Sequence, residues 1–199
     1  MSNHIVTDLE LHGKFAITVD NVFSPEECKE LIALSESKDG YKQALVNIGD
    51  GQQASLPDVR NNDRWMTDDV AMAADFFARL IPYLPKTFEG LPVSCLNERL
   101  RFLRYDPGQY FAPHEDGEYT RDDNSETSRV TVQIYLNDSG LVGGETRFIG
   151  PYKDTVVYPK TGRVLLFQHD ILHEGSRVFS GRKYVIRTDV MYSYDMDQK

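Results

Sequence analysis

Short strand patterns separated by turns fill the second half of this chain, and their order restricts the folds open to it. Each segment is only a few residues long, and most alternate between apolar and polar side chains as half-buried strands do. The segments are Glu98–Tyr105, Arg129–Leu136, Glu145–Phe148, Lys153–Tyr158, Arg163–Phe167 and Lys183–Tyr192. Many short strands with turns between them predict a barrel or a jelly roll.

One strand pattern and two helical patterns precede these segments. Phe15–Val19 alternates as a strand does. Ser24 then has the features of an N-cap, because a proline follows it and Glu27 completes a capping box. A helix is expected from there to about Ser37, and a second helical period runs through residues 70–81. The predicted fold class is therefore α+β and mainly β, with the helices N-terminal to most strands.

Three polar stretches are predicted to connect these elements. Gly40–Arg64 is loop-rich, and a loop of this length inside a compact domain is often functional. Pro85–Pro92 is expected to be a connector, and Gly117–Ser128 to be an acidic loop.

Length and composition describe one globular domain. The chain has 199 residues, of which 40% are hydrophobic and 27% charged, enough for one sizeable core. We assign residues 1–14 to a polar N-terminal arm and residues 15–199 to a single domain. The net charge of −9 argues against a nucleic-acid partner, because phosphate binding requires a basic face.

No segment of the sequence indicates export or a membrane. The polar N-terminal residues lack the apolar core of a signal peptide, and no apolar run is long enough to span a bilayer. The cysteines Cys28 and Cys95 have no metal-type spacing and are expected to be reduced thiols. We expect a cytoplasmic protein without a membrane partner, and nothing in the sequence indicates its oligomeric state.

A His-x-Asp pattern follows the strand that ends near Tyr105. Side chains at i and i+2 of an extended chain share a face, so His114 and Asp116 are expected to project together. A third ligand is available far downstream at His173. Two histidines and one carboxylate form the facial triad of non-haem Fe(II) oxygenases. His169 is the alternative third ligand.

Several residues together resemble one family, the prolyl 4-hydroxylase-like branch of the Fe(II)/2-oxoglutarate dioxygenases. The residues that carry the resemblance are Tyr105, His114, Asp116, Tyr135, Gly143–Phe148, His173 and Lys183. Phe15–Ser35 also looks like the opening strand and helix of that domain, so the resemblance covers about residues 15–192. It implies a double-stranded β-helix, the jelly roll of this family, with the N-terminal helices packed on one sheet.

The resemblance also implies the cofactors and the residues that bind them. Iron would be held by His114, Asp116 and His173, since His173 but not His169 has the family's spacing to the basic residue Lys183. Lys183 and the Tyr135 hydroxyl would bind the far carboxylate of 2-oxoglutarate. The remaining implied components are Tyr105 in the iron pocket, O₂ as cosubstrate, and ascorbate as a candidate reductant.

The substrate pocket is predicted from strand alternation and from the long loop. Arg187 and Asp189 share the face of Lys183. They either pair with each other as a structural element or act at the active site, and the sequence leaves both alternatives open. The other candidates for the pocket are Tyr110, which follows Pro107-Gly108, and Arg60 and Arg64 of the long loop.

The function implied by the resemblance is hydroxylation of an unactivated C–H bond. Asp116 favours hydroxylation over halogenation, because halogenating relatives lack this carboxylate. A prolyl residue in a peptide is placed slightly ahead of a free amino acid or other small molecule as the substrate. The alternative class is a cupin-type metal protein, which would not need Lys183 because it does not bind 2-oxoglutarate.

Overall fold

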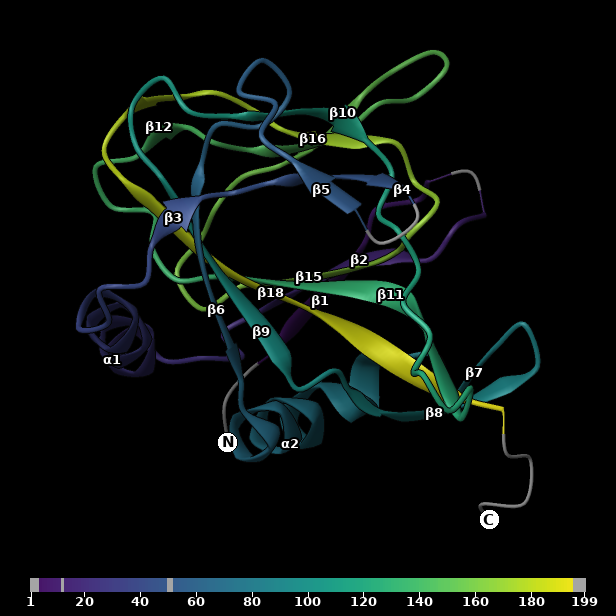
Figure 1. Cartoon of the computed structure of the whole chain (residues 1–199). Coiled ribbons are helices and arrows are strands. Elements are labelled where there is room, and N and C mark those ends of the chain that lie inside the picture. The colour runs from purple at the N-terminus through teal and green to yellow at the C-terminus, as the bar shows by residue number, and fades with distance from the viewer. Residues whose placement is uncertain (1–3, 12, 50–51, 195–199) are drawn as a thin grey trace.

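Two antiparallel sheets form the body of the molecule. The computed structural model describes residues 4–11, 13–49 and 52–194. The large sheet has the strand order β1-β2-β15-β11-β18-β9-β6-β3, with β8 beside β18 and β7 beside β8. The smaller sheet has the order β10-β16-β13-β14, and β12–β17 and β4–β5 form separate pairs. In Figure 1 the smaller sheet lies above the large sheet, and α1 and α2 lie on the side of the large sheet that faces away from the smaller one.

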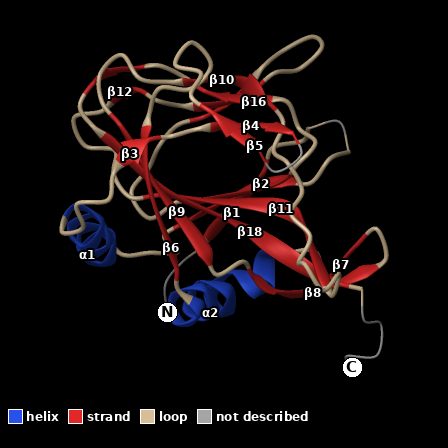
Figure 2. Ribbon diagram, viewed as in Figure 1, coloured by secondary structure: helices blue, strands red, loops and turns tan. Residues whose placement is uncertain are grey.

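Two α-helices and one 3-10 helix accompany the strands (Figure 2). The helices are α1 (Pro25–Glu36), α2 (Val70–Leu80) and the 3-10 helix Ile81–Tyr83. The strands are β1 (Ile5–Asp8), β2 (Ala16–Asp20), β3 (Lys42–Gln43), β4 (Val46–Gly49), β5 (Gln52–Ala54), β6 (Asp63–Asp68), β7 (Thr87–Phe88), β8 (Leu91–Leu96), β9 (Arg99–Tyr105), β10 (Phe111–His114), β11 (Glu126–Tyr135), β12 (Val142–Gly143), β13 (Thr146–Phe148), β14 (Thr155–Val157), β15 (Val164–Gln168), β16 (His173–Gly175), β17 (Val178–Ser180) and β18 (Lys183–Ser193). The predicted mainly-β jelly roll with helices on one sheet is confirmed.

Strand alternation divides the large sheet into a helix-facing side and an inner side. On β18, Ile186 faces its cross-strand partner Ile134, and both lie in the core cluster that includes residues of α2. The next residue, Val185, pairs with Tyr135 and lies in the cluster between the two sheets. A strand has a period of two, so Lys183 and the other odd-numbered side chains of β18 also face the space between the sheets.

Capping residues determine where the helices begin. Ser24 accepts a hydrogen bond from the Glu27 amide and the Glu27 carboxylate accepts one from the Ser24 amide, the predicted capping box. Asp69 caps α2 by accepting from the Met72 amide at 2.9 Å. The buried residues of α2 are Ala73, Phe76 and Leu80. No helix in the described ranges is long and apolar enough to cross a membrane.

Two segments predicted as loops contain strands, which corrects the sequence analysis. Within residues 40–64 the chain forms β3, the β4–β5 hairpin and the start of β6. Within residues 85–92 it forms β7 and the first residues of β8. These strands are short or lie near the edge of a sheet, where both faces can be polar. Most of them span only two to four residues, too few for alternation to distinguish a strand from a loop.

The predicted N-terminal arm contains a strand. Residues 5–8 form β1, which pairs in register with β2, for example Val6 with Val19. The division into an arm and a domain remains a prediction. His4 contacts the Tyr83 hydroxyl, and His12 lies outside the described residues.

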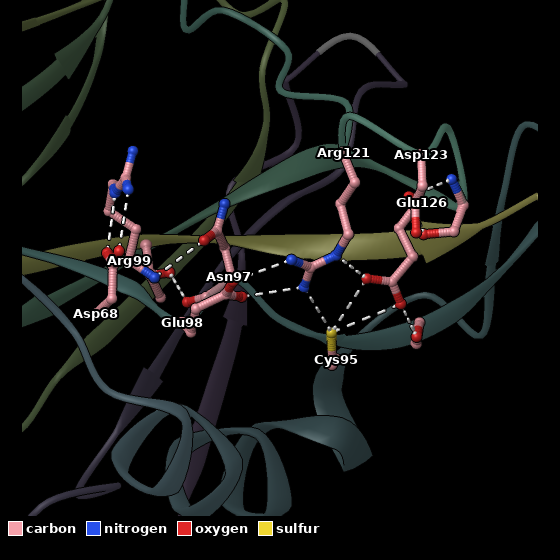
Figure 3. A network of polar contacts seen from close by, with 11 residues as sticks. Asp68, Cys95, Asn97, Glu98, Arg99, Arg121, Asp123 and Glu126 are labelled. Carbon is pink, nitrogen blue, oxygen red and sulfur yellow. Dashed lines mark hydrogen bonds and ion pairs between the residues drawn. The ribbon is translucent and has the colours of Figure 1, made fainter.

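Ion pairs attach the acidic loop between β10 and β11 to the large sheet. The Arg121 guanidinium donates to Glu98 at 3.0 Å and to Glu126 at 2.5 Å (Figure 3). Cys95 on β8 lies beside the same Glu126, with its Sγ 3.7 Å from each carboxylate oxygen. This network holds the middle of the loop next to the turn between β8 and β9, at one side of the space between the sheets.

Candidate metal centre and adjoining cavities

Strand pairing brings three potential metal ligands together. His114 ends β10 and His173 begins β16, and these two residues are direct cross-strand partners. Asp116 follows two residues after His114, and its carboxylate lies 3.7 Å from His114 Nε2 and 3.8 Å from His173 Nε2. One donor atom from each of the three side chains lies within 4.8 Å of the others. The structure thus groups the residues predicted as the facial triad.

Backbone carbonyls orient both imidazoles. Nδ1 of His114 lies 2.8 Å from the Ala112 carbonyl oxygen, and Nδ1 of His173 lies 2.8 Å from that of Ile171. An Nδ1–H that donates to a carbonyl leaves the Nε2 lone pair free for a metal. Burial lowers the pKa of His173 and lowers that of His114 to about 3, so both rings are neutral near pH 7, as ligation requires.

The Asp116 carboxylate is ionised and held on both oxygens. Thr131 Oγ1 donates to Oδ2 at 2.6 Å, and Arg187 Nη2 lies 2.9 Å from Oδ1. Burial is the largest single effect and opposes its ionisation, but the Arg187 charge and the other neighbouring groups, including the Thr131 hydrogen bond, together outweigh it and hold the pKa of Asp116 well below its usual range. Two neutral imidazoles and one carboxylate on one side of a site fit a divalent iron with open positions opposite.

His169 is not part of this cluster. Its ring lies 3.7 Å from Asp189 and is 4% exposed. Among the described residues its two ring nitrogens form no hydrogen bond. The group that the geometry assembles contains His173, in agreement with the sequence-based preference.

An inner cavity of about 30 Å³ joins the metal cluster to Lys183. The Lys183 side chain is 3% exposed, and its Nζ lies 4.9 Å from the ring centre of Tyr105 and 5.6 Å from that of Tyr135. In the described part of the chain no carboxylate lies within ion-pair distance of Nζ. Burial therefore lowers the pKa of Lys183 to about 7. A buried cation without an anion favours the binding of an anionic ligand beside it.

Gly144 leaves room for this lysine. A Cβ at this position would lie 3.1 Å from Lys183 Cδ, and the glycine has φ +76°. A larger residue would be strained in this left-handed conformation and would press on the lysine. The left-handed backbone and the nearby lysine therefore explain why a glycine occupies position 144.

Thr146 and Gln133 line the inner cavity, and the sequence analysis missed both. Thr146 Oγ1 lies 2.7 Å from the Tyr135 hydroxyl and accepts from Gln133 Nε2 at 2.7 Å. Tyr135 itself is fully buried and is not among the residues that line the cavity. Thr146 therefore places a hydroxyl on the inner cavity, and the buried Tyr135 hydroxyl contacts it. The place of Thr146 in the Gly143–Phe148 motif could have identified it.

Arg187 is both ion-paired and located at the metal cluster. Its Nη2 lies 2.9 Å from Asp116 and 3.3 Å from Asp189, and Arg101 binds Asp189 from the other side at 3.0 Å. The sequence left open whether Arg187 and Asp189 form a structural pair or lie at the active site. Both are the case, because Arg187 pairs with Asp189 and also contacts the carboxylate of Asp116 in the metal cluster. Arg187 also lines the inner cavity.

The remaining predicted pocket residues divide into two groups. Tyr105 and Arg60 line the inner cavity, and Arg60 and Arg64 line a wider outer cavity of about 440 Å³ beside it. Tyr110 is not among the residues lining either cavity, since its hydroxyl donates to the Asp58 carbonyl at 2.8 Å and Arg177 covers its ring. Trp65 packs on Phe102 in the helix-facing core, with ring centres 4.8 Å apart.

Comparisons with known proteins agree with this site. Residues 100–188 match the family described as the 2OG-Fe(II) oxygenase superfamily, and this range contains all three clustered ligands and Lys183. A protein of Acanthamoeba polyphaga mimivirus, described as "Putative prolyl 4-hydroxylase", is 26% identical over 189 residues, covering 84% of this chain and 70% of its own.

Two solved structures establish the fold by similarity. The viral collagen prolyl hydroxylase of Paramecium bursaria Chlorella virus-1, in its 2OG complex, has a TM-score of 0.61 and 22% identity over 92% of this chain and 99% of its own. A Trichoplax adhaerens prolyl hydroxylase, bound to a fragment of hypoxia inducible factor, has a TM-score of 0.70 and 15% identity over 91% and 85%. Residues 100–188, which hold the clustered histidines, the carboxylate and the buried lysine, are thus similar to the 2OG-Fe(II) oxygenase superfamily, and the chain has the fold of prolyl hydroxylases.

Proposed function

We propose that this protein is an Fe(II)/2-oxoglutarate-dependent hydroxylase that acts on a prolyl residue in a peptide or protein. The observation that carries the proposal is the inner cavity, which joins a His-Asp-His cluster to an unpaired buried lysine. The prolyl substrate is supported by the mimivirus relative and by the two prolyl hydroxylases that share the fold. A cupin-type protein would have no use for a cation at this place.

The proposed ligand set follows from the chemistry of the donors. His114 and His173 would bind Fe(II) through Nε2, and Asp116 through one carboxylate oxygen. Lys183 would bind the far carboxylate of 2-oxoglutarate and the Thr146 hydroxyl would donate to it, while the other end of the cosubstrate binds the metal. Once bound, iron with 2-oxoglutarate and O₂ supplies the oxidation that inserts oxygen into a C–H bond and releases succinate and CO₂.

The protein's own residues orient these components and limit the access of water. The backbone carbonyls of Ala112 and Ile171 hold the imidazoles in the ligating tautomer. Thr131 and Arg187 hold the carboxylate of Asp116. Tyr105, with 4% of its surface exposed, lines the inner cavity together with Lys183 and the metal cluster. These contacts exist before any ligand binds, so little reorganisation is needed at the reacting centre.

The decisive experiment is mass spectrometry of candidate substrates after incubation with Fe(II), 2-oxoglutarate, O₂ and ascorbate as reductant. Blocked prolyl peptides and free amino acids, L-proline among them, are supplied in parallel. The expected result is a product heavier by one oxygen atom, with one succinate formed for each product molecule. A +O product on an amino acid but on no peptide would replace the peptide by a small molecule. A protein that neither binds 2-oxoglutarate nor forms succinate would overturn the proposal.

The pKa of Lys183 predicts a proton uptake. Without ligand this pKa is lowered to about 7, and a bound carboxylate raises it. Below pH 7 the lysine is already charged, so binding takes up no proton. Above pH 7 the lysine must gain a proton to bind, and affinity for 2-oxoglutarate should fall by up to about tenfold per pH unit.

Calorimetry of the anaerobic Fe(II) protein at pH 8 tests this linkage. In buffers with different heats of ionisation, 2-oxoglutarate binding should show uptake of most of one proton. The Lys183→Arg protein should show none, since a guanidinium stays charged throughout this range. Buffer-independent binding heats in the unaltered protein would contradict the prediction.

A further inference from the structure

Five arginines converge on the outer cavity beside the metal cluster. They are Arg60, Arg64, Arg99, Arg101 and Arg187. The concentration is unexpected in a chain whose net charge is −9. The question is which of these cations already have an anion within the protein.

Three of the five arginines are matched by carboxylates. The pairs are Arg99 with Asp68 at 2.9 Å, Arg101 with Asp189 at 3.0 Å, and Arg187 with Asp116 at 2.9 Å. Figure 3 shows the first of them, in which both Asp68 oxygens accept from the Arg99 guanidinium. The charge of each of these three arginines is therefore matched within the protein.

Arg60 and Arg64 have hydrogen-bond partners that are neutral. Arg60 Nε donates to Asn62 Oδ1 at 2.8 Å, and Arg64 Nη2 donates to Gln53 Oε1 at 3.2 Å. Within residues 4–11, 13–49 and 52–194, neither arginine lies within ion-pair distance of a carboxylate. Burial lowers the pKa of Arg60 to about 10 and lowers that of Arg64 as well. Both charges are therefore partly desolvated without a matching anion.

The Arg60 guanidinium is held rigidly at a short distance from the metal cluster. The side chain is 7% exposed, and its Cζ lies 4.4 Å from the centre of the Phe111 ring. That ring in turn stacks on His114, with ring centres 3.5 Å apart. A buried cation that is unpaired costs free energy, and an arriving anion recovers this cost.

The carboxylates that line the outer cavity do not supply this anion. Asp116 and Asp189 are engaged by Arg187, and Glu118 pairs with Arg129. Glu115 is exposed and forms no ion pair with a described residue. The proposed cosubstrate site is the inner cavity between Lys183 and the metal ligands, which Arg60 lines but Arg64 does not, so the cosubstrate does not supply an anion to Arg64. Arg64 lines only the outer cavity.

We propose that the substrate of this site carries a carboxylate that binds Arg60 and Arg64 in the outer cavity. The inference rests on the proposed function, because it concerns the substrate of the same enzyme. Two sources share this chemistry. One is an aspartate or glutamate side chain beside the target residue of a peptide, and the other is the α-carboxylate of a free amino acid. A guanidinium donates two parallel hydrogen bonds to either group.

Binding to the anaerobic Fe(II)·2-oxoglutarate protein tests the proposal without turnover. The probes are blocked prolyl peptides that carry Glu or Gln directly before or after the proline, and L-proline against L-prolinamide. At least one carboxylate probe should bind about tenfold to a hundredfold more tightly than its amide, as a charge-assisted hydrogen bond predicts. A preference among the peptides identifies the side-chain source, and a preference for L-proline identifies the α-carboxylate.

The variants assign the preference to the arginines. In Arg64→Gln the advantage of the preferred carboxylate should fall at least about fivefold. In Arg64→Glu, a peptide with Lys at the same place should bind better than the Glu peptide. Arg182→Gln is the matched control, because it removes an arginine paired with Asp106 outside both cavities, and it should retain the full preference. Melting temperatures of all variants confirm that each is folded.

The comparison of Glu with Gln probes uses the unaltered protein, so it does not depend on any variant folding. If no carboxylate probe binds more tightly than its amide, the inference is overturned. The same holds if the preference survives unchanged in Arg64→Gln. A +O product on any probe, together with equal binding of every carboxylate probe and its amide, would remove the inference and leave the proposed hydroxylase intact. Carboxylate binding without a +O product on any probe would instead count against the proposed function.

Discussion

Replacement of Asp116 by alanine is expected to abolish turnover and to weaken Fe(II) binding by at least about a hundredfold. The remaining His114 and His173 would provide only two protein ligands, and loss even of a group that supports a ligand costs 10–100-fold in affinity. The change also leaves Thr131 and Arg187 without the carboxylate oxygens they now contact at 2.6 and 2.9 Å. Iron titration and succinate formation measure the two effects separately.

Asp122→Ala serves as the matched control for this change. Asp122 is an exposed carboxylate in the same loop, six positions along from Asp116, and it forms no ion pair with a described residue. Its removal should leave iron affinity and turnover close to those of the unaltered protein. His114→Ala and His173→Ala should behave like Asp116→Ala, whereas His169→Ala should retain iron. Full activity of Asp116→Ala would refute the assigned ligand set.

Replacement of Lys183 by alanine is expected to raise the KM for 2-oxoglutarate by roughly tenfold to a few hundredfold. A charge-assisted hydrogen bond is worth about 1.5–3 kcal/mol, and deletion of the cation also leaves a buried carboxylate unpaired. Iron affinity should change far less, because Lys183 is not among the clustered ligands. The contrast between these two parameters distinguishes loss of the cosubstrate anchor from general damage to the site.

The neighbours of Lys183 provide graded controls. Arg182→Ala should have little effect on the KM, since Arg182 is exposed and pairs with Asp106 at 2.6 Å. Tyr135→Phe should raise the KM for 2-oxoglutarate less than Lys183→Ala does. Thr146→Val should raise the KM for 2-oxoglutarate more than Tyr135→Phe does. Thr146 lines the inner cavity, whereas the Tyr135 hydroxyl contacts Thr146 and not the cavity. An unchanged KM in both Lys183→Ala and Arg182→Ala would refute the assigned 2-oxoglutarate site.

Local patterns predicted much of the framework because their physical causes are local. The capping box of Ser24 and Glu27 fixed the start of α1, and alternation in β9, β11 and β18 and the apolar run in β15 predicted these strands to within a few residues. The short polar strands β3, β4, β5 and β7 were missed. Their formation depends on pairing with partners that a local pattern does not contain.

The sequence by itself predicted the candidate site residues: a His-x-Asp pattern, a distant histidine, and a lysine whose strand face follows from a period of two. Only the tertiary structure decided which hydroxyl lines the inner cavity and which arginines lie beside the metal cluster. Thr146 contacts the buried Tyr135 hydroxyl and Arg187 pairs with Asp116, while Arg60 and Arg64 line the outer cavity with no carboxylate partner among the described residues. These relations depend on the register between β11, β13 and β18 and on the course of the chain through residues 40–64. They arise from contacts between segments distant in sequence, and no local propensity encodes them.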